Sequence, residues 1–156
     1  MRRGTKTASA ASASRSPARA ERLRLLFLAS EAEPFAKTGG LGDVVGALST
    51  ALTKLGHDVR VVLPLYRAVP RAGLRASDPL VVALGAEQLP AKTWKAPLPG
   101  GTAARPGSRE RRAGEAVFID LPNLYDRDGL YQAAGKDHPD NLRRFSALCQ
   151  AGLRLA

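Results

Sequence analysis

The feature that most constrains the fold is a glycine-rich segment, residues 37–44, which reads KTGGLGDV and lies between an apolar run and a helical pattern. Because Gly39, Gly40 and Gly42 carry no side chain, backbone amides here can come close to an anion. A helix that begins at this point adds its unpaired first-turn amides and the positive end of its dipole. With the ammonium of Lys37, the segment predicts a phosphate-binding site; a flexible turn with an exposed lysine is the alternative.

The flanking patterns predict a βαβ unit with parallel strands. Residues 23–29 are almost continuously apolar, which is typical of a central strand covered on both faces. Residues 58–63 form the next apolar strand, and Pro64 would stop it. Between them a helix is expected, ended by Gly56 and with one face toward the sheet. That face is marked by apolar residues at helical spacing, namely Leu41, Val44, Val45, Leu48, Leu52 and Leu55.

The second half of the chain is expected to add strands and one more helix. Residues 80–84 read as a strand, a segment around Trp94 as another, and residues 115–120 as a third that ends at Asp120. Residues 97–114 are rich in Pro, Gly and Arg and predict an exposed loop. The whole pattern indicates an α/β protein with a Rossmann-like parallel sheet.

The last helix is expected near the end of the chain. Pro139 is tolerated in a first helical turn, and Asp137 is a candidate N-cap. A lone cysteine on such a helix is most simply a small buried residue, and it allows no internal disulfide. The predicted buried side consists of Leu142, Phe145, Cys149 (or Leu148), Gly152 and Leu155.

The net charge of +10 is concentrated outside the predicted fold. Residues 1–22 carry +5 and residues 100–112 carry +3, which leaves the rest of the chain near neutral. Few aromatic side chains are available to stack on bases, so we expect no nucleic-acid partner. No apolar run approaches the roughly 20 residues that span a bilayer, so no membrane partner is expected.

Residues 1–22 predict a disordered leader, because they are rich in Ala, Ser and Arg and cannot bury much apolar surface. An Arg-rich, Ser-rich and acid-poor segment is also the composition of an organellar transit peptide. Both interpretations leave residues 23–156 as the folded part.

Four blocks of the chain resemble, in order, the N-terminal part of the bacterial glycogen synthases and plant starch synthases. They are residues 29–48 (ASEAEPFAKTGGLGDVVGAL), 56–66 (GHDVRVVLPLY), 118–131 (with FID and LYDRDGLY) and 140–145 (DNLRRF). The resemblance covers residues 23–156 and is weak in the middle.

The resemblance implies a retaining glucosyltransferase that transfers glucose from ADP-glucose to the non-reducing end of an α-1,4-glucan such as glycogen. It also implies a GT-B architecture, in which two Rossmann-like domains enclose the active site, and no cofactor or metal. Residues 23–156 would supply part of the first domain. The family's catalytic-cleft residues would lie beyond Ala156, so we expect no glucose transfer by these 156 residues alone. The expected location is the bacterial cytoplasm, or a plastid if residues 1–22 are a transit peptide.

The resemblance also implies roles for individual residues. Lys37 would bind the donor phosphates beside the glycine amides, Asp43 would contact substrate hydroxyls, and Tyr131 would line the sugar cleft. Independently of the family, Glu31 directly follows the first strand, where open α/β sheets bind ligands. The predicted substrate-binding residues are Lys37, Gly39, Gly40, Asp43, Tyr131 and Glu31.

Two further groups of charged or titratable residues lie in the predicted loops. Asp126 and Arg127 read as an ion pair within one loop. His57 and His138 have no partners at metal-ligand spacing, so no metal site is predicted.

The main alternative is an NADP-type dinucleotide-binding oxidoreductase domain. Residues 40–46 (GLGDVVG) spell G-x-G-x-x-x-G, a variant of the dinucleotide fingerprint. However, these glycines follow the first strand only after a long loop. The second strand also ends at Pro64 with no acidic residue for a ribose hydroxyl. A Walker-type nucleotide site is excluded, because no Gly-Lys-Ser/Thr follows the glycines.

Overall fold

The computed structural model describes residues 21–100 and 114–156. Most of the expected leader (1–22) and the centre of the expected 97–114 loop lie outside these residues. The two ends of that loop segment are joined, because the amide of Leu98 donates to the carbonyl oxygen of Gly114 at 3.1 Å. Both end residues are buried rather than exposed.

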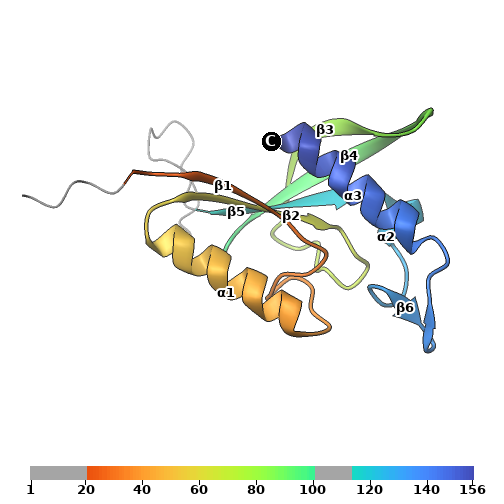
Figure 1. The fold of residues 1–156 in the computed structure, drawn as a ribbon, viewed down its shortest axis with the longest axis horizontal. Helices are drawn as coiled ribbons and strands as arrows, with labels where there is room; N and C mark the ends of the chain where they lie inside the picture. The colour runs from red at the N-terminus through yellow and green to blue at the C-terminus, as the bar shows by residue number, and fades with distance from the viewer. Residues whose placement is uncertain (1–20, 101–113) are drawn as a thin grey trace, which may run out of the picture.

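A five-stranded mixed sheet forms the centre of the molecule (Figure 1). Its strands are β1 (Arg24–Leu28), β2 (Asp58–Pro64), β5 (Glu115–Asp120), β4 (Glu87–Pro97) and β3 (Arg75–Leu84), in that spatial order. β1, β2 and β5 are parallel, whereas β4 and β3 form an antiparallel hairpin that continues the sheet beyond β5. The prediction of an α/β fold with a Rossmann-like parallel sheet is confirmed, with this antiparallel extension.

Two long helices cover the sheet, and Figure 1 shows them on opposite sides of it. α1 (Gly40–Lys54) connects β1 to β2, and α3 (Asn141–Leu155) lies near the end of the chain. Between β5 and α3 come the short helix α2 (Pro122–Tyr125) and a small hairpin of β6 (Gln132–Ala133) and β7 (Lys136–Asp137).

The core is centred on β2 and β5, whose apolar side chains are almost completely buried between the two helical layers. The predicted βαβ unit is confirmed. Gly56 ends α1 with a φ of +91°, a conformation that glycine adopts without strain. The strand predicted around residues 80–84 and the one around Trp94 are the two arms of the β3–β4 hairpin.

Within the described residues the first strand has a neighbour on one side only. Among the described residues β1 forms one edge of the sheet, paired only with β2, and Leu26 and Leu28 are about two-fifths exposed. A run of apolar residues indicates a strand, but it does not show whether the strand has one neighbour or two.

The buried face of α1 also differs from the prediction. Val45 is buried as predicted, but Leu41, Val44, Leu48 and Leu55 are exposed, although their spacing is that of a buried stripe. The helix instead turns its small residues inward, because the turn at residues 31–36 approaches the helix backbone closely. The amide of Glu33 donates to the carbonyl oxygen of Gly42 at 3.0 Å. The buried residues of α1 are Gly42, Val45, Gly46, Ser49 and Thr53.

The last helix begins later than predicted. Its N-cap is Asp140, whereas Asp137 lies in β7. The buried side is also shifted, since Leu142 is 84% exposed and Cys149 is exposed, while Leu148 and Gly152 are buried as expected. Arg144 on this helix is fully buried, although arginine side chains are usually exposed. The observed buried set is Arg144, Ala147, Leu148, Ala151 and Gly152.

Candidate functional site

The candidate site lies at the edge of the sheet where the three parallel strands end. Because β1, β2 and β5 run in the same direction, the segments that follow them meet at this edge. Glu31 follows β1, Arg67 follows β2, and the loop that leads to Tyr131 follows β5. The structure therefore brings together segments that are widely separated in the sequence.

The glycine-rich segment forms an open helix start. Gly39 is the N-cap of α1 in an extended conformation, and no side chain caps the helix. A Cβ atom added at Gly39 or Gly40 would meet nothing within 4 Å, so packing of the described chain does not require glycine at either position. The first-turn amides of α1 have no carbonyl one turn back in the helix, and Gly40 and Leu41 at its start are exposed, whereas Gly42 is buried.

The charged side chains at the helix start are paired. Nζ of Lys37 donates to Oδ1 of Asp43 at 2.6 Å, and both side chains are about half exposed. The hydrogen bond to Asp43 raises the pKa of Lys37, so the ammonium is present at neutral pH. Exposed pairs of this kind contribute little to stability, so Lys37 can exchange this carboxylate for another anion at small cost.

Glu31 is buried beneath the glycine-rich segment, with 3% of its surface exposed. The backbone amides of Thr38 and Gly39 donate to its Oε2 at 2.6 and 3.2 Å. The hydroxyl groups of Thr38 and Tyr131 donate to its Oε1 at 2.8 and 2.6 Å. Burial by itself raises the pKa of Glu31, but these hydrogen bonds outweigh it, and the pKa lies below its ordinary value.

Tyr131 connects this carboxylate to the loop after β5. Its phenolic oxygen also lies 2.7 Å from Oγ of Ser30. Since the single phenolic proton is directed to Glu31, the hydroxyl of Ser30 donates to Tyr131. Burial, and then the hydrogen bond to Glu31, raises the pKa of Tyr131 to about 12, so the phenol stays protonated and acts as a donor.

The backbone of Tyr131 is held by the start of α3. Nδ2 of Asn141 donates to the carbonyl oxygen of Tyr131 at 2.8 Å, and Nη1 of Arg144 donates to Oδ1 of Asn141 at 2.7 Å. The ring of Tyr131 packs against that of Phe145, with centroids 5.6 Å apart. Arg144 is therefore linked to the glycine-rich segment by hydrogen bonds that pass through Asn141, Tyr131 and Glu31.

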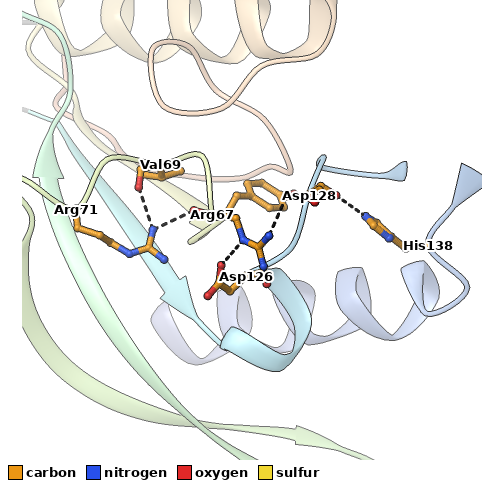
Figure 2. Close-up of polar contacts among 7 residues, drawn as sticks. Arg67, Val69, Arg71, Asp126, Asp128 and His138 are labelled. Carbon is orange, nitrogen blue, oxygen red and sulfur yellow. Dashed lines mark hydrogen bonds and ion pairs between the residues drawn. The ribbon is translucent and has the colours of Figure 1, made fainter. Parts of the chain in front are cut away.

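A second group of contacts ties the loop after β2 to the loop after β5 (Figure 2). The guanidinium of Arg67 binds Oδ1 of Asp126 at 2.8 Å and Oδ1 of Asp128 at 2.9 Å. It also donates to the carbonyl oxygen of Asp126, and Nε2 of His138 lies 3.2 Å from the carbonyl oxygen of Asp128. The same figure shows Arg71 donating to the carbonyl oxygen of Val69.

The predicted ion pair within the loop is wrong. Asp126 pairs with Arg67, and Arg127 pairs with Asp140 at 2.8 Å. Neighbouring residues in an irregular loop point in different directions, so each side chain finds a partner on another segment.

Of the predicted site residues, five lie on the glycine-rich segment or just before it, and Tyr131 reaches them through Glu31. Four residues of this network, Thr38, Arg67, Asn141 and Arg144, were not among the predicted site residues. Asn141 and Arg144 lie within the DNLRRF block and Thr38 within KTGG, so the blocks that carry the family resemblance were the available signal. No comparable signal pointed to Arg67.

The described part of the chain contains no cluster of three or more His, Cys, Asp or Glu side chains that could hold a metal ion. Within residues 21–100 and 114–156, none of the helices is long and apolar enough to cross a membrane. A surface hollow near Arg24, Asp58 and Leu155 lies at the opposite ends of β1 and β2 and is separate from the candidate site.

Acidification should weaken the network around Glu31. Its pKa is lowered in the folded state, so its contribution to stability is complete above the ordinary carboxyl pKa of 4.5 and is lost as the pH falls through the lowered value. We expect the melting temperature of Glu31→Gln to depend less on pH than that of the wild type between about pH 5 and pH 3. Glu33→Gln removes an exposed carboxylate from the same turn and is the control. Parallel curves for the wild type and Glu31→Gln would contradict this prediction.

Comparison with known proteins identifies the class to which this fold and site belong. The family model of the starch synthase catalytic domain matches residues 24–156, and the chain belongs to this family of glycogen and starch synthases. The sequence-based recognition of the family and of part of a GT-B-type fold is confirmed, and the oxidoreductase alternative is not supported.

Particular relatives agree with this assignment. The chain is 41% identical over 139 residues to a glycogen synthase of Dechloromonas aromatica, covering 85% of this chain and 25% of that protein. A glycogen synthase of Syntrophotalea carbinolica is 42% identical over 126 residues, covering 79% and 23%. The chain thus spans about a quarter of the length of these relatives.

A solved structure is also similar. It is the catalytic domain of starch synthase IV from Arabidopsis thaliana, bound to ADP and acarbose. The TM-score is 0.69 at 30% sequence identity, covering 86% of this chain and 25% of that one.

Proposed function

We propose that this chain forms the phosphate-binding part of the donor site of a glucosyltransferase that transfers glucose from ADP-glucose to an α-1,4-glucan. The observation that carries the proposal is the open start of α1. Its N-cap residue forms no side-chain cap, and a Cβ atom added at Gly39 or Gly40 would meet no described atom within 4 Å. Lys37 places an ammonium beside this helix end.

The chemistry of the proposed reaction fits these groups. Glucose transfer releases ADP, and the negative charge that develops on the leaving phosphate must be stabilised. An ammonium and a helix N-terminus supply positive charge at fixed positions, and they require little rearrangement during the reaction. The starch synthase IV structure was solved with ADP and acarbose, which supports a nucleotide and a glucan-like ligand for this family.

The roles of the remaining residues follow from their positions. We propose that Asp43 accepts hydrogen bonds from substrate hydroxyls once Lys37 turns to the phosphates, since its carboxylate is exposed at the same helix end. We propose that Tyr131 lines the sugar side of the site from the loop after β5. Because the relatives are about four times longer, the complete transfer reaction is proposed for a protein that also supplies the other wall of the cleft.

We further propose that the reaction takes place in the cytoplasm of a bacterium, because the curated relatives are bacterial glycogen synthases. A plastid location remains the alternative if residues 1–22 act as a transit peptide.

Titration of the 156-residue chain with ADP tests the proposal. The described residues supply one wall of the proposed site, so we expect a dissociation constant of about 1 mM, measured by NMR or calorimetry. Lys37→Ala should weaken binding about tenfold, because a charge-assisted contact is lost, and should leave the melting temperature unchanged. Lys54→Ala is the matched control, since it removes an exposed lysine from the last turn of the same helix.

Equal affinity of Lys37→Ala and the wild type for ADP would refute the proposed role of Lys37. Tighter binding of NADP than of ADP-glucose or ADP would contradict the proposed donor.

A further inference from the structure

We propose that Glu31 is a positioning residue that holds the glycine-rich segment and removes two backbone amides from the ligand site. The inference rests on the proposed function and specifies which atoms meet the donor. A donor phosphate would then contact Lys37 and the first-turn amides of residues 40–42. The amides of Thr38 and Gly39 would stay on Glu31 in both the free and the bound protein.

The first argument is the saturation of the carboxylate. An ionised carboxylate offers about four lone-pair sites. Four donors occupy them, at distances between 2.6 and 3.2 Å: the amide and hydroxyl of Thr38, the amide of Gly39 and the phenol of Tyr131. With 3% of its surface exposed, Glu31 has neither a free acceptor site nor access to a substrate hydroxyl. Any effect of Glu31 on binding must therefore pass through the groups that it holds.

The second argument concerns which amides remain. The glycines at positions 39 and 40 would allow many backbone conformations in an unsupported loop. Two amide bonds to one buried carboxylate fix the orientation of the peptide groups that lead into the helix. The helix begins at Gly40, so the next amides belong to its first turn and point out of the helix end. Glu31 thereby divides the segment into an inner part bound to the carboxylate and an outer part open to a ligand.

The third argument is the link to Tyr131, which lies 100 residues later in the chain. Its phenol is the fourth hydrogen-bond donor to Glu31, and its carbonyl oxygen accepts a hydrogen bond from the side chain of Asn141. The orientation of the glycine-rich segment therefore depends on the loop after β5, which we place on the sugar side of the site. Replacing Tyr131 by Phe would remove one of the four donors and keep the ring packing on Phe145.

Amide exchange and ADP titration of the whole ¹⁵N-labelled chain test this inference. In Glu31→Gln one acceptor oxygen is replaced by an NH₂ donor, and we expect the amides of Thr38 and Gly39 to exchange at least about tenfold faster. ADP affinity should fall by a similar factor, and Tyr131→Phe should show a smaller change of the same kind in both measurements. Glu33→Gln, on the same turn and exposed, should match the wild type in the exchange of the Thr38 and Gly39 amides.

Two readouts separate positioning from a merely structural role. In the wild type, ADP should shift the amide resonances of residues 40–42 while the slow exchange of Thr38 and Gly39 persists. Acid titration of the wild type should also move the Thr38 and Gly39 amide resonances together, and this coupled titration should be absent in Glu31→Gln. Faster exchange of the Thr38 and Gly39 amides on addition of ADP would overturn the division into inner and outer amides.

The outcomes distinguish this inference from the proposed function. If ADP binds and Lys37→Ala weakens it, but Glu31→Gln changes neither affinity nor exchange, the proposed function stands and the role of Glu31 is refuted. If ADP does not bind the wild type, the proposed function fails, and the exchange data alone decide whether Glu31 holds the segment. If Glu31→Gln does not fold, Tyr131→Phe and the acid titration of the wild type decide the question, and unchanged exchange in Tyr131→Phe would count against the link.

Discussion

Replacing Arg144 by alanine is expected to lower the free energy of unfolding by about 3 kcal/mol or more. The side chain is fully buried, and its guanidinium lies near the rings of Tyr125 and Phe145. Its Nε donates to the carbonyl oxygen of Leu124 at 2.7 Å, and its Nη1 donates to Asn141. Truncation therefore leaves a cavity, a buried acceptor on Leu124 and a partly buried acceptor on Asn141 that have lost their donor.

Urea denaturation measures this loss, and the neighbouring residue provides the control. Arg143 forms an exposed ion pair with Glu87, so Arg143→Ala should change stability by less than about 1 kcal/mol. Arg144→Met fills most of the space without donating hydrogen bonds, and it separates the cavity from the lost donors. Similar midpoints for Arg144→Ala and Arg143→Ala would contradict the structural role of the buried guanidinium.

The same substitution should reach the candidate site. Arg144 donates to the side-chain amide oxygen of Asn141, and the nitrogen of that amide donates to the backbone of Tyr131. The phenol of Tyr131 in turn donates to Glu31. We therefore expect weaker ADP binding by Arg144→Ala even under conditions where the variant is folded.

The second large effect is expected at Gly46. A Cβ atom at this position would lie 2.5 Å from the carbonyl oxygen of Glu33, a backbone atom that cannot move without shifting the whole turn at residues 31–36. Gly46→Ala should therefore cost about 1–3 kcal/mol, although alanine is the better helix former. Denaturation monitored by circular dichroism measures this cost.

Gly40→Ala is the matched control, on the same helix. A Cβ atom there meets nothing within 4 Å, so the substitution should be neutral or stabilise the fold by up to about 1 kcal/mol. It should nevertheless weaken ADP binding, because the added methyl group stands in the proposed path of the phosphate. A stable Gly46→Ala, or a destabilised Gly40→Ala, would contradict the packing described for α1.

The local elements follow from local sequence. Three local features were predicted: the β1–α1–β2 unit, the strand that ends at Asp120 and the helix end at Gly56. Each depends on side-chain spacing and backbone freedom within a few residues. The glycine-rich helix start was predicted for the same reason. Its position at the carboxyl edge of the sheet follows from the parallel strand order.

Tertiary structure alone decided which faces and partners these elements use. The apolar stripe of α1 indicated a helix, but the close approach of the 31–36 turn to Gly46 selected the small residues as the buried face. The pairing of Glu31 with Tyr131 joins residues 100 positions apart, and neither neighbourhood contains a local signal for the other. Burial of Arg144 likewise depends on acceptors from α2 and the start of α3. Spacing along the chain determines conformation over one or two turns, whereas a buried polar group is satisfied only by what the fold brings to it.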